Sequence, residues 1–350
     1  MIRVGIAGIG FMGMIHYHAY EKVRGARVTA ICETDPKRLA GDWRGIKGNF
    51  GPAGKRMDLG GIARYDQLDK LVADPNIDLI DVCLPPALHA DTTVAALTAG
   101  KHVFCEKPIA LTTAEADRMV KTAGRSGKLL LIGHVLPFFT QYQLAYRAAM
   151  EGKYGRLLGG NFKRVISDPL WIPDFYDPAK VGGPVVDLHV HDAHFIRVLF
   201  GMPAAVQSVG RMRGEVPEYF NTQFLFEDPS LVVTATSGVI YQQGRPFTHG
   251  FEVHFEKATL IYDDLAALGV TQDPARSVAV LTEDGKATRP KLRLGDELDA
   301  FAAEINEVVA AVRTNTPSTL LDGVLARDAL VLCHKQTDSI RRGRTIRIGR

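Results

Sequence analysis

The stretch Gly8-Ile9-Gly10-Phe11-Met12-Gly13 decides the fold of the first third of this chain. It follows the apolar run Arg3–Ala7 and opens a helical pattern, the context in which a GxGxxG motif binds a dinucleotide. Gly8 allows a tight turn, Gly10 lets the backbone approach a pyrophosphate, and Gly13 lets the helix pack closely on the strand. The free N–H groups that open the helix favour phosphates. We therefore expect the cofactor to contact Gly8, Gly10, Phe11, Met12 and Gly13.

An acidic residue ends the next predicted strand, Arg27–Cys32. Glu33 lies about 20 residues after Gly13, where a carboxylate accepts a hydrogen bond from the ribose 2′-hydroxyl. The same charge repels the 2′-phosphate of NADP, and Thr34 follows with no arginine immediately beside it. The sequence therefore favours NAD, with NADP as the alternative.

Residues 1–133 alternate strand-like and helical runs, which predicts a Rossmann-type α/β domain with a parallel sheet. Further strand-like runs are Leu79–Leu84, His102–Cys105 and Leu129–Ile132, and the helical runs include Ala87–Ala99 and Thr112–Ser126. The glycine-rich segment Trp43–Gly60 interrupts this alternation. We expect it to be a surface loop that covers the cofactor.

Residues 134–350 have a different pattern of apolar and polar residues, which predicts an α+β domain on an open, mostly antiparallel sheet. Period-two alternation, as in Phe251–Glu256, recurs over residues 204–283. The other expected elements are a helix at Gln141–Met150, a strand at Leu157–Ile166, an aromatic loop at Ser167–Gly183, a helix at Val185–Phe200, helices at Glu297–Arg313 and Asp322–Arg341, and a strand at Thr345–Ile348. We expect the closing helices, residues 297–341, to pack back toward the first domain.

Composition excludes several classes of partner. A net charge of +3 with 23% charged residues does not favour nucleic acid or membrane surfaces. No apolar run approaches the roughly 20 residues that span a bilayer. The chain opens directly as a strand without a signal peptide, and its four cysteines form no CxxC. We expect buried thiols in a protein of the reducing cytoplasm.

Two segments carry unusual chemistry. Glu106-Lys107-Pro108 lies at the carboxyl end of a predicted parallel strand, where ligands bind in open α/β sheets. In the second segment, Gly182–His194, a helix would place Asp187 and His191 on one face as i,i+4 neighbours, with His194 at i+7. The alternatives are a surface lysine, a charge that stabilises the helix start, and packed histidines.

With these segments, the sequence resembles the glucose–fructose oxidoreductase / inositol dehydrogenase / rhizopine-catabolism (Gfo/Idh/MocA) family. The resemblance extends over essentially the whole chain. The segments that match are the glycine motif, Asp81–His89, Ala99–Pro108, Gly182–His191 and Val198–Gly201. The resemblance implies that Lys107 holds a substrate hydroxyl and the nicotinamide ribose. It makes His191 the general base and Asp187 its orienting partner. Cofactor contacts would extend to Leu84, Pro85, His89 and Glu106, and the family's association through the sheet implies a homodimer or homotetramer.

Other side chains are candidates for binding substrate. Trp171 and Tyr176 would stack on a sugar face or anchor their loop, and His134 would approach the ligands or pack in the core. Family members often have aspartate where this chain has His194, a departure that would mark a different substrate. The same histidines, His189, His191 and His194, suggest a zinc site as an alternative, but residues two apart on a helix, such as His189 and His191, point about 200° apart. We therefore expect no metal.

The main prediction is an NAD-dependent oxidoreductase acting on a CH–OH group of a sugar, cyclitol or related polyol. A redox-neutral enzyme that cleaves glycosides through transient oxidation is the first alternative, and a non-catalytic NAD(H) sensor is the second. The substrate and the direction of the reaction do not follow from the sequence.

Overall fold

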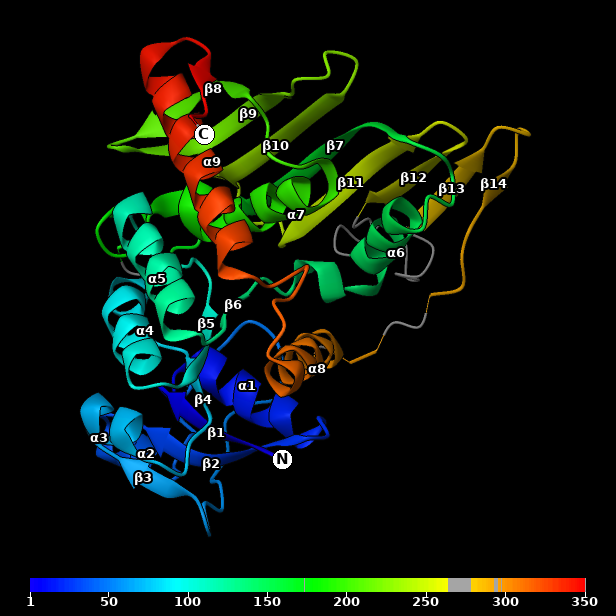
Figure 1. The fold of residues 1–350 in the computed structure, drawn as a ribbon. Coiled ribbons are helices and arrows are strands. Elements are labelled where there is room, and N and C mark those ends of the chain that lie inside the picture. The colour runs from blue at the N-terminus through cyan, green and yellow to red at the C-terminus, as the bar shows by residue number, and fades with distance from the viewer. Residues whose placement is uncertain (173, 264–277, 293–294, 297, 350) are drawn as a thin grey trace. The chain divides into compact units, whose positions relative to one another are not determined.

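A computed structural model describes residues 1–172, 174–263, 278–292, 295–296 and 298–349 (Figure 1). The chain forms two units, each built from two separate stretches of sequence. The first unit comprises Met1–Phe138 and Gly295–Arg327, and the second comprises Phe139–Leu294 and Asp328–Arg350.

The first unit is built on a six-stranded parallel sheet with the strand order β3-β2-β1-β4-β5-β6. The strands are β1 (Ile2–Ala7), β2 (Ala26–Cys32), β3 (Ala63–Tyr65), β4 (Leu79–Val82), β5 (His102–Glu106) and β6 (Leu130–Gly133). The order reverses between β1 and β4, and ligands of such sheets bind beyond the carboxyl ends of the strands at this point. The glycine motif follows β1, so it lies at this reversal. The prediction of a Rossmann fold is confirmed.

The helices of the first unit connect and flank these strands. They are α1 (Phe11–Glu21), α2 (Pro36–Leu39), α3 (Leu68–Ala73), η1 (Pro86–Leu88), α4 (His89–Thr98), α5 (Thr113–Ser126), η2 (Leu136–Phe138) and α8 (Asp299–Thr314). Helix α5 shows how the sequence sets a boundary, because Thr112 and Glu115 form a reciprocal capping box and Gly127 ends the helix at φ 65°. Helix α8 packs on α1, and Lys22 pairs with Asp296 and Asp299.

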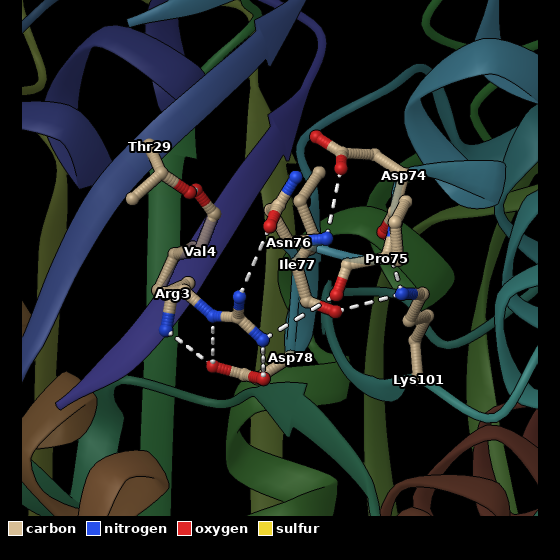
Figure 2. Close-up of polar contacts among 9 residues, drawn as sticks. All are labelled: Arg3, Val4, Thr29, Asp74, Pro75, Asn76, Ile77, Asp78 and Lys101. Carbon is tan, nitrogen blue, oxygen red and sulfur yellow. Dashed lines mark hydrogen bonds and ion pairs between the residues drawn. The ribbon is translucent and has the colours of Figure 1, made fainter. Parts of the chain in front are cut away.

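A polar network ties together the amino ends of the strands, away from the glycine motif (Figure 2). The Arg3 guanidinium donates to both carboxylate oxygens of Asp78, at 2.7 and 3.0 Å, which joins β1 to the residue before β4. The Lys101 ammonium, just before β5, donates to the carbonyl oxygens of Asp74 and Ile77 at 2.6 and 2.8 Å. This edge of the sheet therefore carries stabilising contacts.

The glycine-rich segment 43–60 is anchored to the rest of the first unit by aromatic side chains. Trp43 is fully buried, its ring lies edge-on to Tyr17 at 4.9 Å, and its Nε1 donates to the carbonyl of Arg38 at 2.9 Å. Phe50 contacts the ring of Phe11 at 4.8 Å and stacks on Phe301 of α8 at 5.5 Å. Most residues of the segment are exposed, as predicted for a surface loop, and these aromatic side chains anchor it against α1 and α8. Sequence periodicity missed the short elements β3 and α3.

The second unit is built on a nine-stranded sheet with the order β14-β13-β12-β11-β7-β10-β9-β8-β15. The strands are β7 (Leu157–Ser167), β8 (Ala205–Arg213), β9 (Val216–Leu225), β10 (Val232–Ile240), β11 (Thr248–Phe255), β12 (Ala258–Asp263), β13 (Val278–Thr282), β14 (Ala287–Thr288) and β15 (Ile346–Arg347). Every pair is antiparallel except β7 with β10. The predicted open, mostly antiparallel sheet is confirmed, although residues 264–277 of the predicted strand region lie outside the described part.

Three helices lie against this sheet: α6 (Thr140–Met150), α7 (Val190–Phe200) and α9 (Gly323–Arg342), of which α9 belongs to the second unit from Asp328 onward (Figure 1). Tyr142 of α6 and Phe195 of α7 have ring centroids 5.1 Å apart, and Tyr142 also meets Phe251 and Tyr262 of the sheet. This aromatic cluster forms much of the core between helices and sheet. The predicted closing helices and final strand correspond to α8, α9 and β15, with Glu297 outside the described residues.

The helix predicted at Val185–Phe200 has two parts. Its first turn, Pro184–Leu188 (η3), is a π-helix in which His189 N–H donates to the Pro184 carbonyl at 2.8 Å. Regular α-helix begins only at Val190. The prediction of one continuous α-helix is therefore wrong, because the first turn closes an i→i+5 hydrogen bond, which is wider than the i→i+4 bond of an α-helix. None of the described helices is long and apolar enough to cross a membrane.

Candidate active site

The glycine motif leaves open space beside its middle residue. Gly8 has φ +94°, and a Cβ there would lie 2.8 Å from the carbonyl oxygen of Cys83. A Cβ on Gly13 would lie 2.0 Å from the carbonyl oxygen of Gly8, so helix and strand pack too closely for any side chain. A Cβ on Gly10 would meet nothing within 4 Å. Gly8 and Gly13 are therefore required by the close packing of the turn, whereas Gly10 leaves space beside the backbone for a ligand.

The start of α1 suits an anion. Gly10 is the N-cap, and no side chain caps the helix within the described residues. The first turn, which includes Phe11, Met12 and Gly13, contains no acidic side chain. The N–H groups of a first turn have no acceptor inside the helix, and the helix dipole is positive there. These groups fit the pyrophosphate of a dinucleotide.

The Glu33 carboxylate is built into the glycine turn. One oxygen accepts from the Ile9 N–H at 2.9 Å, and the other accepts from the Asp35 N–H at 2.9 Å. Arg38 lies 3.9 Å from the same carboxylate, a neighbour that the sequence spacing did not reveal. Glu33 is thus buried and fixed at the end of β2, where the ribose of a dinucleotide is expected.

The turn after β4 contains the other predicted cofactor residues of this unit. The Leu84 side chain would lie 3.0 Å from a Cβ on Gly8, and Pro85 is exposed. His89 is fully buried, with Nδ1 2.8 Å from the Pro108 carbonyl oxygen and Nε2 2.8 Å from that of Leu84. Burial lowers the pKa of His89. Its ring therefore ties the turn after β4 to the segment after β5.

Lys107 follows directly after β5 and is half-buried. Its N–H donates to one carboxylate oxygen of Glu106 at 3.0 Å. The other oxygen of Glu106 lies 3.0 Å from Nε2 of His16, a residue of α1 that the sequence did not single out. On the neighbouring strand β6, a Cβ on Gly133 would lie 3.1 Å from this oxygen, so glycine leaves room for the Glu106 side chain.

The predicted substrate residue His134 follows β6 in the first unit. It is fully buried, and its N–H donates to the Ile132 carbonyl at 2.7 Å. The backbone around it is thereby held in a tight turn at the carboxyl end of the sheet.

In the second unit, Asp187 lies in the π-helical turn and His191 in the first turn of α7, and both are half-buried. The simple i,i+4 geometry of a regular helix therefore does not describe this pair. His194 and His189 are fully buried, and His189 packs edge-on to Phe220 at 5.1 Å. Burial lowers the pKa of His189 to about 4.

A buried ion pair lies beneath the same helix and was missed by sequence reasoning. Both oxygens of Asp192 accept from the Arg164 guanidinium, at 2.6 and 3.2 Å, and both side chains are almost fully buried. The Asp192 carboxylate therefore neutralises the buried charge of Arg164. In the described part of the chain, one group of three potential metal ligands lies within 4.8 Å of one another, and it is His16, Asp81 and Cys83 rather than the histidines of α7.

The loop after β7 holds the two predicted aromatic residues. Tyr176 donates to Asp168 at 2.8 Å, and the Arg213 guanidinium lies 3.9 Å from the centre of its ring. Trp171 is 65% exposed. A hollow of about 440 Å³ is lined by Asp168, Pro169, Leu170, Ile172, Asp174, Phe175, Tyr176, Asp177 and Arg213. Asp168 and Arg213 thus hold the Tyr176 ring in place where it lines the hollow, whereas the Trp171 side chain is largely exposed to solvent.

Comparisons with known proteins agree with this geometry. Residues 2–134 match the model of the GFO/IDH/MocA oxidoreductase family with an NAD-binding Rossmann fold, and residues 142–261 match the GFO/IDH/MocA C-terminal domain. The chain is 31% identical over 231 residues to 1,5-anhydro-D-fructose reductase of Ensifer adhaerens, covering 64% of this chain and 67% of the relative.

Two further relatives match over greater lengths. Inositol 2-dehydrogenase of Rhizobium meliloti is 25% identical over 323 residues, covering 89% of this chain and 88% of the relative. The fold is shared with a solved structure of levoglucosan dehydrogenase in complex with NADH and levoglucosan. That structure has a TM-score of 0.80, with 19% sequence identity over 100% of both chains.

Proposed function

Since this chain belongs to the GFO/IDH/MocA oxidoreductase family and carries its NAD-binding Rossmann domain, we propose that it oxidises or reduces a CH–OH group of a sugar, cyclitol or related polyol. The observation that carries the proposal is a complete dinucleotide site: the turn around Gly8, the clear surface at Gly10, the uncapped start of α1 and the buried Glu33. A sugar or polyol substrate is supported by relatives named anhydrofructose reductase and inositol dehydrogenase.

The chain's own groups would hold the dinucleotide as follows. The first-turn N–H groups of Phe11 and Met12 would donate to the pyrophosphate, and Glu33 would accept from the ribose. Leu84 borders the glycine turn, Pro85 next to it would extend the contact, and Glu106 accepts from the N–H of Lys107. When bound, NAD supplies the hydride acceptor, and the protein supplies orientation and proton transfer.

We assign the acid–base chemistry to Lys107, Asp187 and His191. Imidazole exchanges protons near neutral pH, which suits His191 to take the proton of the reacting hydroxyl. Lys107 would donate to that hydroxyl and hold it while its C–H bond breaks. Asp187 would orient the base and stabilise its charged form, as a carboxylate does for a catalytic imidazole.

Substrate contacts are proposed for His134, Tyr176, Trp171 and His194. Tyr176 is the best supported, because Asp168 and Arg213 brace its ring beside the hollow described above. An exposed indole such as that of Trp171 offers a flat apolar surface to the C–H face of a sugar ring.

The test is formation of NADH by the purified protein with NAD and a panel of cyclitols, anhydrosugars and aldoses. His191→Asn and Lys107→Met should each lower kcat by about a hundredfold or more while NAD still binds. Near-normal turnover in both variants would show that these roles are misassigned. Cleavage of a glycoside without net NADH would select the redox-neutral reaction, and NAD binding without any turnover would select a sensor.

We further propose that copies of the chain associate through the face of the nine-stranded sheet opposite α6 and α7. Cross-strand pairs there are exposed and polar, such as Asn161 with Thr234 at 2.7 Å and Asn221 with Thr236 at 2.8 Å. Light scattering after gel filtration tests this, and Thr234→Arg with Thr236→Arg should shift a dimer or tetramer toward the monomer. A monomeric mass for the unaltered protein would refute it.

A further inference from the structure

His16 joins two strands at the edge of the sheet where the cofactor is expected. Its Nδ1 lies 2.9 and 3.1 Å from the two carboxylate oxygens of Asp81 in β4, and its Nε2 lies 3.0 Å from a carboxylate oxygen of Glu106 in β5. The ring is completely buried and stacks on Phe104 at 5.2 Å, with an angle of 10° between the planes. Its position is therefore fixed on three sides.

The contacts determine the protonation of the ring. Ionised carboxylates only accept hydrogen bonds, so an imidazole between two of them donates from both nitrogens and carries a positive charge. Burial is the strongest single influence and acts against this charge, but the charges and hydrogen bonds of Asp81 and Cys83 together outweigh it, and the pKa of His16 is raised well above its usual value.

A third buried carboxyl group nearby does not compete for this charge. Glu304 of α8 is fully buried, and neither of its oxygens has a hydrogen-bond partner in the described part of the chain. Burial, together with the charge of Glu106, raises the pKa of Glu304 well above its usual value, so this group stays neutral. The His16 imidazolium therefore pairs with two carboxylates, those of Asp81 and Glu106.

We propose that His16 is a positioning residue for Lys107. The chain of contacts runs from Asp81 through His16 to one oxygen of Glu106, and from the other oxygen of Glu106 to the N–H of Lys107. Glu106 cannot rotate without losing both contacts, so the imidazolium fixes the backbone from which Lys107 projects. A displacement of a reacting group by about 1 Å can cost roughly a hundredfold in rate. Only the consequence for catalysis rests on the function proposed above.

The first experiment measures amide hydrogen exchange in the full-length protein. His16→Gln removes the charge and cannot contact both carboxylates as the ring does. We expect the Lys107 amide to exchange at least about tenfold faster, with β1 amides unchanged. His18→Gln is the matched control, because His18 contacts Glu21 at 2.9 Å on the same helix without reaching β5. It should leave the Lys107 amide protected.

The second measurement separates positioning from stability. In His16→Gln, kcat should fall about a hundredfold while the Kd for NAD changes less than about threefold. A lower Tm with unchanged kcat and unchanged Lys107 protection would overturn the proposal, and so would a loss of NAD affinity as large as the loss of kcat. If His16→Gln does not fold, Asp81→Asn takes its place with the same expected results, because it removes the charge that holds the His16 ring. Wild-type values in both measurements would overturn the proposal. If the unaltered protein oxidises no polyol, the proposed function fails, but amide exchange still decides whether His16 fixes Lys107.

Discussion

The carboxylate of Glu33 accepts a hydrogen bond of 2.9 Å from the N–H of Ile9, which lies inside the glycine motif. The acid at the end of β2 is therefore already in contact with the turn that would hold the pyrophosphate. A carboxylate fixed in this way accepts from a ribose hydroxyl and repels a phosphate at the same position.

Glu33→Ser should weaken NAD binding about 10- to 100-fold, the range expected for one hydrogen bond to a charged group. It should also narrow the preference for NAD over NADP, because the nearby Arg38 is freed to meet a 2′-phosphate. Fluorescence titration with NADH and NADPH measures both. Asp35→Ser is the control: Asp35 caps α2 and lies 3.7 Å from Arg38, so its loss loosens Arg38 but keeps the Glu33 carboxylate. An equal loss of NAD affinity in the two variants would contradict the assignment.

Gly10→Ala and Gly13→Ala should have opposite effects. Gly10 has φ −84°, and an added methyl meets only open space, so Tm should stay unchanged while NAD affinity falls at least about tenfold. Gly13→Ala forces a Cβ to within 2.0 Å of a carbonyl oxygen and should destabilise the protein by about 1–3 kcal/mol. Thermal unfolding and NADH titration distinguish the two. Normal NAD affinity in a folded Gly10→Ala protein would remove this residue from the site.

Substituting Asp187 and Asp192, five residues apart, should affect different properties: activity for Asp187 and stability for Asp192. Asp192→Asn leaves the Arg164 guanidinium buried without its counter-charge and should cost about 3–5 kcal/mol of stability. Asp187→Asn should leave the free energy of unfolding nearly unchanged and lower kcat about tenfold or more. Urea unfolding and initial rates measured side by side test this. A stable Asp192→Asn protein, or an Asp187→Asn protein with full activity, would contradict the division of roles.

His189 should make the protein sensitive to mild acid. Its pKa is about 4 in the folded protein, because burial disfavours the charged ring, and about 6.5 when unfolded. Between these values the unfolded chain binds the proton first, so stability falls as the pH drops. The loss between pH 7 and pH 5 should be about 2 kcal/mol from this group. His189→Leu should remove that part of the pH dependence in urea unfolding. An unchanged slope would show that other groups cause it.

The sequence was informative where function depends on neighbouring residues in the chain. The glycine turn needs only the local order of Gly8, Gly10 and Gly13. The alternation of strands and helices predicts the first sheet, and period-two alternation predicts the second. Glu33 was found because its distance from the glycines is set by one βαβ unit. These features are local, so spacing alone reveals them.

Features that depend on strand register were not predictable. His16 meets Glu106 only because α1 lies beside the ends of β4 and β5, and 90 residues separate the pair. Arg164 and Asp192 come from a strand and a helix whose pairing no periodicity encodes. The π-helical turn before α7 was hidden for another reason. Pro184 is a favourable first residue for any helix, and the sequence does not specify how wide the next turn will be.

The two-stretch construction of each unit bears on how the protein is made. Strand β6 completes its hydrogen bonding with a late segment: Ile132 N–H donates to the Leu321 carbonyl at 2.8 Å. The second unit closes later still, with Ile346 and Arg347 of β15 pairing with β8. During synthesis the ribosome delivers the N-terminal strands long before these partners emerge. The six strands of the first sheet therefore emerge early, but the first unit lacks its closing segment until Arg327 is made, and the nine-stranded sheet lacks its edge strand until β15 follows.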